Sequence, residues 1–227
     1  MIEPFIDALT AEGDPARAAG LRAHHRIDRP YLGLTHPQIN ALAADWRDRT
    51  DLPGRIALAD GLWRTNIFEA RLAAARLLTQ ARLRPDDSAA WNLIVSWVPD
   101  FDSAVLADHA SMAGQKRVVS DPGRLDEVAE WTTSGHLWTR RAALVITLPW
   151  TRQNHPDAAE TATRERILGW AADYAGDQTW EVQKALAQWL HDLSKHDPDR
   201  VRAFLKRHAP DMRPSAVKEA ARRLPKA

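Results

Sequence analysis

The chain of 227 residues contains no cysteine. This absence excludes a disulfide framework, a cysteine-ligated zinc site and a thiol nucleophile, and it is compatible with the reducing cytoplasm, where we expect the protein to reside. Long hydrophobic runs are also missing, because the longest, Ala142–Trp150, is far too short to span a bilayer. The first residues, Met1–Leu9, include Glu3 and Asp7 and no basic residue, unlike a secretory signal peptide. We therefore expect no membrane partner.

Signals for β-structure and for several enzyme classes are absent as well. We find no convincing strand alternation and no Asn-Gly hairpin turn. A Gly-rich phosphate loop and a Gly-x-Ser-x-Gly elbow are both missing. His191 and His196 are five positions apart, a spacing that does not align them on one helix face. The sequence therefore predicts neither a metal site nor a cofactor.

Helical signals, by contrast, recur along the whole chain. A capping residue stands before a proline at Asp14-Pro15, Asp121-Pro122 and Asp197-Pro198, where the missing amide hydrogen of a first helical residue does no harm. The segment Thr35–Gln38 fits a capping box. Apolar residues of Val182–Leu193 recur with helical period. These patterns predict an all-α protein of about a dozen short helices.

The spacing of the helix pairs suggests a repeat architecture. Pairs recur at roughly 40 residues, as in HEAT-like repeats. Because such pairs cannot bury their apolar faces alone, they stack into a curved α-α superhelix (a solenoid) with a concave inner surface. No Gly/Ser-rich linker divides the chain, so we expect one domain over residues 1–227. A compact helical bundle is the competing architecture.

Basic residues are concentrated near the C-terminus, although the net charge is only +1. Such a group is either a set of solvated helix faces or a surface that follows a phosphate backbone. The residues that would line such a backbone-following groove are Arg202, Lys206, Arg207, Arg213 and Lys218.

Two carboxylates stand among aromatic residues in the segment Trp97–Asp102. An acid held against apolar rings is poorly solvated, so its charge needs neutralisation or a cationic partner. A positive charge that develops on a substrate is one such partner. The alternative is that Asp100 or Asp102 caps the following helix.

Several segments resemble, in order along the chain, the AlkD group of DNA alkylation repair proteins, which consist of HEAT-like helical repeats. Together they extend from about Tyr31 to Leu224. The matching segments are Tyr31–Pro37, Leu62-Trp63 with Phe68-Glu69 and Ala73–Ala75, Leu137–Ala143, Val182–Leu186 with Ser194–Pro198, and Lys218–Ala220.

The resemblance implies a function in repair of double-stranded DNA. Active members hydrolyse the N-glycosidic bond of purines alkylated at N3 or N7. Such a base already carries a positive charge and leaves without a general acid, so one carboxylate suffices to stabilise the sugar cation and orient water. Carried over by position, that carboxylate is Asp102, and Arg141 falls on an arginine that lies close to the DNA backbone. We expect the protein to act as a monomer.

The chain departs from the family at two tryptophans that cradle the lesion-bearing nucleotide. Val98 stands at one of these positions, beside Trp97, and Gln188 stands at the other, beside Trp189. On a helix, a shift of one position turns a side chain by about 100°. The possible pocket residues are therefore Trp97, Gln188 and Trp189. The alternative function is that of a catalytically inactive helical-repeat module that binds DNA or serves as a protein scaffold.

Overall fold

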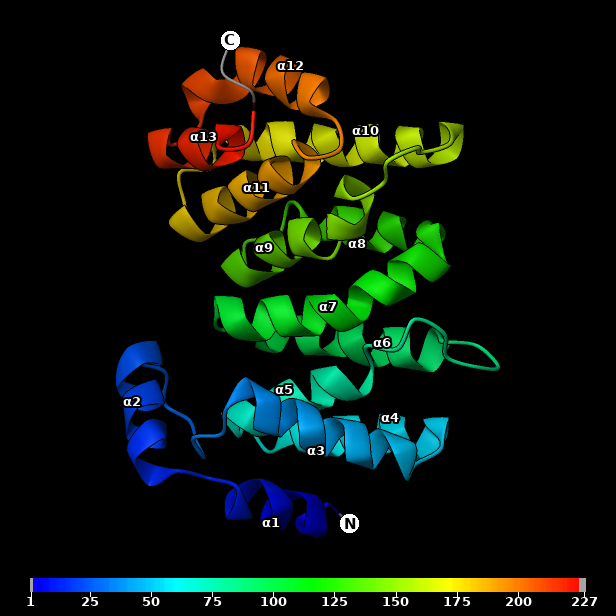
Figure 1. The fold of residues 1–227 in the computed structure, drawn as a ribbon, viewed down its shortest axis with the longest axis vertical. Coiled ribbons are helices and arrows are strands. Elements are labelled where there is room, and N and C mark those ends of the chain that lie inside the picture. The colour runs from blue at the N-terminus through cyan, green and yellow to red at the C-terminus, as the bar shows by residue number, and fades with distance from the viewer. Residues whose placement is uncertain (1, 225–227) are drawn as a thin grey trace. The chain divides into compact units, whose positions relative to one another are not determined.

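The computed structural model describes residues 2–224, and in this range the chain forms thirteen α-helices and no β-strand (Figure 1). The predicted all-α class is therefore confirmed. The chain divides into two compact units, Met1–Ser120 and Asp121–Ala227. That residues 1–227 act as a single domain stays a prediction.

Seven of the α-helices belong to the N-terminal unit. One 3-10 helix, η1, lies between the sixth and the seventh of them. The elements are α1 (Glu3–Ala11), α2 (Pro15–His25), α3 (His36–Asp48), α4 (Leu52–Arg64), α5 (Phe68–Leu77), α6 (Ser88–Trp97), η1 (Val98–Asp100) and α7 (Ala104–Ser120).

The C-terminal unit contributes the other six α-helices and four 3-10 helices among its described residues. The elements are η2 (Pro122–Arg124), α8 (Leu125–Trp131), α9 (Leu137–Val145), η3 (Leu148–Thr151), α10 (Ala158–Asp173), η4 (Tyr174–Gly176), α11 (Trp180–Leu193), α12 (Pro198–His208), η5 (Ala209–Asp211) and α13 (Pro214–Ala221).

Helix starts follow the predicted capping residues. The carboxylates of Asp14 and Asp197 each accept a hydrogen bond from a backbone N–H of the first helical turn, at α2 and α12. Thr35 and Gln38 make both hydrogen bonds of the capping box at α3. Asp121 differs, because it caps the short 3-10 helix η2, with α8 following directly. Local side-chain chemistry thus places most of these boundaries.

The core of the N-terminal unit is organised around α5, which packs against α3, α4 and α7. Ala73, Ala74 and Ala75 are almost fully buried, and their small side chains let these neighbours approach closely. Two charged residues of the same helix, Glu69 and Arg71, are buried as well. A buried charge is costly unless it is paired and hydrogen-bonded, so both side chains need partners.

In the C-terminal unit, α11 has the corresponding central place, between α9 and α13. Its buried side chains include Leu186, Leu190 and Trp189. A polar residue of this helix, Gln183, is also fully buried. It therefore has to satisfy its hydrogen bonds inside the protein.

Candidate functional site

Asp102 lies in the short segment between η1 and α7, and its nearest charged neighbour is Arg29. The Asp102 Oδ2 atom forms an ion pair with Nη2 of Arg29. The Arg29 side chain is only 3% exposed, whereas that of Asp102 is 33% exposed. The hydrogen bond to the first turn of α7 comes instead from the Leu106 amide to the Ser103 hydroxyl. The alternative of a helix cap is therefore wrong for Asp102.

The loop that carries Arg29 is fixed by the start of α5. The buried Glu69 carboxylate accepts hydrogen bonds from the amides of Leu32 (2.9 Å) and Gly33 (2.7 Å). The Phe68 amide donates to the Pro30 carbonyl at 3.1 Å. Gly33 has a φ of +82°, where a side chain would be strained and would collide with the backbone of α2. These contacts hold Arg29 against Asp102 and also give Glu69 its partners.

Asp100, at the end of η1, is held by a second set of contacts. Its Oδ2 atom accepts a hydrogen bond from Trp63 Nε1 at 3.0 Å and lies 3.8 Å from Nη2 of Arg71. The Trp63 ring stacks on Trp97 with centroids 4.4 Å apart. The Arg71 guanidinium lies 4.9 Å from the Trp63 ring centroid. Asp100 therefore caps no helix either. Its side chain is oriented by Trp63 and Arg71, which pack against each other.

The four charged side chains form a group with a defined polarity. Arg29 and Arg71 are 3% and 10% exposed, while Asp102 and Asp100 are 33% and 51% exposed. Burial lowers the pKa of Arg29, and the nearby Arg71 lowers it further; burial also lowers the pKa of Arg71. Arginine nevertheless stays charged, so the group has positive charge inside and negative charge toward solvent. We call these four residues the acid–arginine cluster.

Some polar atoms of this cluster are buried without a hydrogen bond. They are Nε and Nη1 of Arg29 and Oδ1 of Asp102. Because an unsatisfied buried polar atom is costly, a cluster of them points to a polar ligand or water, or to a functional constraint. No motif or spacing in the sequence relates Arg29 to Asp102.

The tryptophans named as possible pocket residues lie in the core. Trp97 is 1% exposed, and Trp189 is fully buried with its Nε1 donating to Thr147 Oγ1 at 3.2 Å. Gln188 is exposed, and its amide donates to Asp192. Neither ring is therefore open to a ligand in this structure.

Arg141 lies in the C-terminal unit, on α9, and is also largely buried. Its Nη1 donates to the Glu181 carbonyl at 2.8 Å and lies 3.7 Å from that residue's carboxylate. These contacts hold the first turn of α11 against α9. In this conformation, Arg141 supports that turn and presents little of its side chain to a phosphate.

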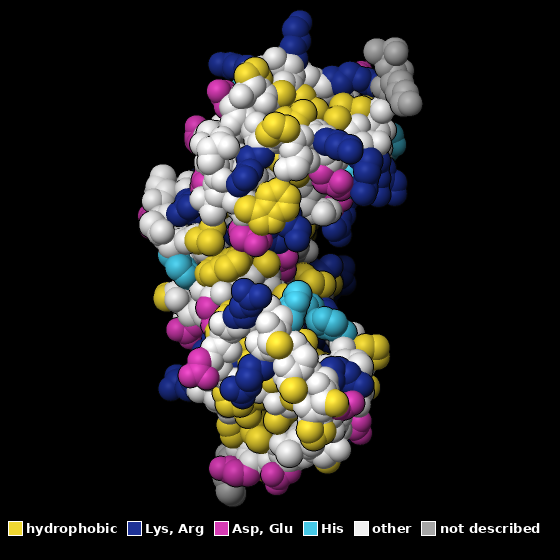
Figure 2. Space-filling model, turned by 90° about the vertical axis from the view of Figure 1, so that its left-hand side faces the viewer, with side chains coloured by type: hydrophobic (Ala, Val, Ile, Leu, Met, Phe, Trp, Pro, Cys, Tyr) yellow, Lys and Arg dark blue, Asp and Glu magenta, His cyan; other side chains and the backbone are white. Residues whose placement is uncertain are grey.

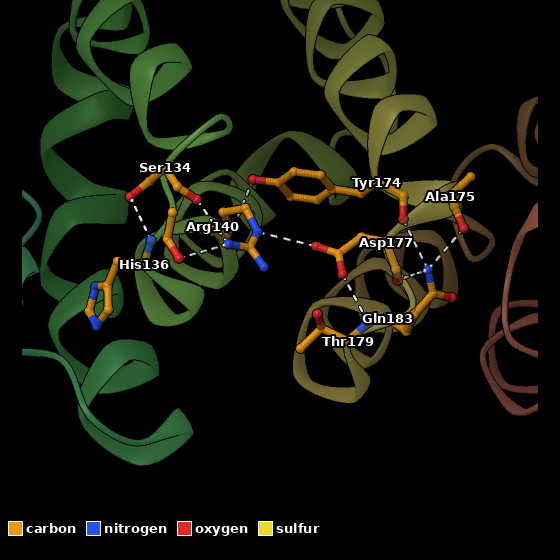
Figure 3. A network of polar contacts seen from close by, with 9 residues as sticks. Ser134, His136, Arg140, Tyr174, Ala175, Asp177, Thr179 and Gln183 are labelled. Atoms are coloured by element: carbon orange, nitrogen blue, oxygen red, sulfur yellow. Dashed lines mark hydrogen bonds and ion pairs between the residues drawn. The ribbon is translucent and has the colours of Figure 1, made fainter.

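The start of α11 is fixed by a polar network that sequence reasoning missed (Figure 3). Arg140 Nε donates to Asp177 at 3.1 Å, and the Tyr174 hydroxyl donates to the Arg140 carbonyl at 3.0 Å. Burial raises the pKa of Tyr174, so this hydroxyl keeps its proton. Gln183 Nε2 donates to the carbonyls of Tyr174, Ala175 and Asp177, and its Oε1 accepts from the Arg213 amide. A buried glutamine that forms hydrogen bonds with four backbone groups leaves no periodic signal in a sequence.

Basic side chains of the C-terminal unit lie at its surface, as Figure 2 shows on one side of this unit. Arg213 is half-buried, with its guanidinium 5.7 Å from the ring of Trp180, which is 47% exposed. The exposed basic residues predicted to bind DNA are Arg202, Lys206, Arg207 and Lys218. Arg202 also pairs with Asp199 on the same helix. The chemistry of this surface suits an anionic partner.

Within residues 2–224, no group of three or more His, Asp or Glu side chains is arranged to hold a metal ion. None of the helices in that range combines the length and the apolar character needed to cross a membrane.

Comparisons with known proteins agree with the all-α fold. A family model described as DNA alkylation repair enzyme matches residues 5–224. No curated protein matches at a significant level. A solved structure described as a predicted DNA alkylation repair enzyme from Enterococcus faecalis aligns with a TM-score of 0.79 and 18% identity, covering 95% of this chain and 98% of that one. The structure of AlkD2 from Streptococcus mutans aligns with a TM-score of 0.66 and 19% identity over both full chains. At these identities the likeness shows a shared helical-repeat fold, as the sequence predicted.

Proposed function

This chain belongs to the DNA alkylation repair enzyme family, and we propose that it hydrolyses the N-glycosidic bond of cationic N3- or N7-alkylated purines in double-stranded DNA. The carboxylate that we assign to the reaction is Asp102. We further propose that the protein acts as a monomer in the cytoplasm.

One observation carries this proposal: in the acid–arginine cluster the two acidic side chains are partly exposed, whereas the two arginine side chains that hold them are buried. Hydrolysis of an alkylpurine nucleotide develops positive charge on the deoxyribose. A fixed negative charge near that sugar lowers the energy of the transition state without any reorganisation during the reaction. Because Arg29 holds Asp102 in place, this acid is preorganised in that sense.

Contacts with the DNA backbone would come from the exposed basic side chains of the C-terminal unit. We assign this function to Arg202, Lys206, Arg207, Arg213 and Lys218. Each phosphate neutralised releases counterions, so affinity should fall linearly with salt on a double-logarithmic plot. Arg141, which the resemblance places near a phosphate, would act mainly by holding the first turn of α11.

The direct test is incubation with duplex DNA that contains 7-methylguanine, followed by quantification of abasic sites under single-turnover conditions. We expect release by the wild type and a loss of roughly 100-fold or more in Asp102→Asn, the size expected when a preorganised charge is removed. Asp45→Asn is the matched control, since Asp45 forms an exposed pair with Arg49 one helical turn away. Release by Asp102→Asn at the wild-type rate would exclude Asp102 as the catalytic acid.

A second function is favoured by the burial of Trp97 and Trp189 and by the valine and glutamine beside them. Without ring faces around the lesion, the protein would bind DNA, or serve as a protein scaffold, without cleaving the N-glycosidic bond. A salt titration with undamaged duplex separates the possibilities. Salt-dependent binding without base release supports the inactive DNA-binding module, whereas no binding even at low salt supports a protein partner.

A further inference from the structure

Asp100 and Asp102 are two carboxylates of one short segment, but they differ in what their oxygen atoms can still bind. Oδ1 of Asp102 is buried, and Oδ2 is paired with Arg29. Asp102 can therefore act on a substrate through its charge, but a water molecule that it held would have to share Oδ2 with the guanidinium.

Asp100 is the more accessible acid, with half of its side chain exposed. Only Oδ2 is held, by the hydrogen bond from Trp63 Nε1 at 3.0 Å. Arg71 lies farther away, at 3.8 Å, so its charge offsets that of Asp100 less than a direct contact would. The other oxygen, Oδ1, makes no hydrogen bond to the residues that the structure describes and can accept one from water.

The side chains that support Asp100 are tightly packed. Trp63 and Trp97 are 2% and 1% exposed and stack with an interplanar angle of 7°. Arg71 covers the Trp63 ring, and its Nε donates to the Trp63 carbonyl at 3.1 Å. A buried indole N–H that donates to a carboxylate fixes the direction of that carboxylate as well as its position. Asp100 is thus held as firmly as a catalytic group must be.

We propose that Asp100 is a second catalytic carboxylate, which holds and deprotonates the attacking water while Asp102 stabilises the sugar cation. This inference rests on the proposed glycosylase function and deepens it. From the sequence, Asp102 alone was expected to stabilise the sugar cation and to orient water. The contacts of the two side chains favour Asp102 for the first function and Asp100 for the second.

The reaction balances as a hydrolysis. The C1′–N9 bond breaks, and its electron pair moves to the purine, which loses its positive charge and leaves as the neutral alkylpurine. The water oxygen forms the new bond to C1′. One water proton passes to the Asp100 carboxylate and from there to solvent, which leaves an abasic deoxyribose and an unchanged enzyme.

The test uses Asp100→Asn, because asparagine keeps an oxygen acceptor for Trp63 Nε1 and removes the negative charge. We expect the single-turnover rate of 7-methylguanine release to fall about 100-fold, as for loss of a general base. The dissociation constant for undamaged duplex should change less than twofold. Asp48→Asn is the control, because Asp48 is 79% exposed on α3 and outside the cluster.

Azide distinguishes the two acids, since this small anion attacks a sugar cation without having to lose a proton. Sodium azide should restore base release by Asp100→Asn, with a 1-azido sugar in place of the abasic site, and should not restore release by Asp102→Asn. Trp63→Phe removes the hydrogen bond and keeps the stacked ring, so we expect a smaller loss of rate, with azide again compensating.

Two results would exclude Asp100 as the second catalytic carboxylate while leaving the proposed function intact. One is a rate for Asp100→Asn within twofold of the wild type while Asp102→Asn is inactive. The other is rescue by azide of Asp102→Asn but not of Asp100→Asn. A wild-type protein that releases no alkylpurine would instead refute the proposed function itself, and the second carboxylate with it.

Discussion

The ion pair between Arg29 and Asp102 predicts an asymmetric pattern of stabilities. Asp102→Asn removes the counterion of a guanidinium that is 3% exposed and already has two nitrogen atoms without partners. Removing one member of a buried pair typically costs 3–5 kcal/mol, because the other charge stays buried. Since Asp102 itself is one-third exposed, we expect the lower end of that range, about 3 kcal/mol of unfolding free energy.

The reverse change should cost less. Arg29→Met removes the buried charge and fills much of its volume, and the carboxylate that remains is partly hydrated. We expect a loss of about 1 kcal/mol, as for a partly exposed pair. The double variant Arg29→Met/Asp102→Asn should resemble Arg29→Met, since no uncompensated charge remains. The coupling energy from the double-mutant cycle would then be about 3 kcal/mol.

Urea unfolding followed by tryptophan fluorescence measures these differences, because Trp63 and Trp97 lie beside the cluster. Asp45→Asn again serves as the exposed control and should cost less than 1 kcal/mol. Equal losses for Asp102→Asn and Arg29→Met, or a coupling energy below about 0.5 kcal/mol, would show that Arg29 does not depend on Asp102 for its charge compensation.

Two further predictions concern buried polar groups. Gln183→Leu leaves three carbonyls and the Arg213 amide without their partner, so the unfolding free energy in urea should fall by about 3 kcal/mol, whereas the exposed Gln188→Leu should change it by less than 0.5 kcal/mol. Burial lowers the pKa of His109 from 6.5 to about 4, with Arg76 and His36 adding to the effect. The unfolded chain therefore binds the proton more tightly, and stability should decrease by up to about 3 kcal/mol as the pH falls from 6.5 to 4. Unfolding of His109→Phe over the same pH range should lack this dependence, and an unchanged slope would assign it to other groups.

The helical elements could largely be predicted because their signals are local. Asp14, Thr35 and Asp197 each accept a hydrogen bond from the amide three residues later, so the signal lies within a short stretch of sequence. Helix ends are less evident from the sequence, as at α5, which ends at Leu77. Apolar residues continue past this end as part of the loop, and a periodic pattern does not distinguish buried helix from buried loop.

The site could be predicted only in part, since its contacts join distant segments. The sequence singled out Asp102 and noted Asp100, but it gave no reason to connect Arg29 or Trp63 with them. Such pairs are determined by how α5 holds the preceding loop and by how α4 packs on α6. The same packing buries Trp97, which a count along the chain alone could place either in a pocket or in the core.

Val98 and Gln188, where the resemblance places two tryptophans, and the proposed second acid, Asp100, both bear on how a cationic lesion would be attracted. A cationic base is attracted either by the face of an aromatic ring, worth about 0.5–2 kcal/mol, or by a carboxylate. In this chain Trp97 supports Asp100 from the core, through its stack on Trp63, and its own face is not open to a ligand. Attraction for a cationic lesion would then come from the charge of Asp100. Because salt screens a half-exposed charge more than it weakens ring contact, preference for alkylated over undamaged duplex should decrease as ionic strength rises.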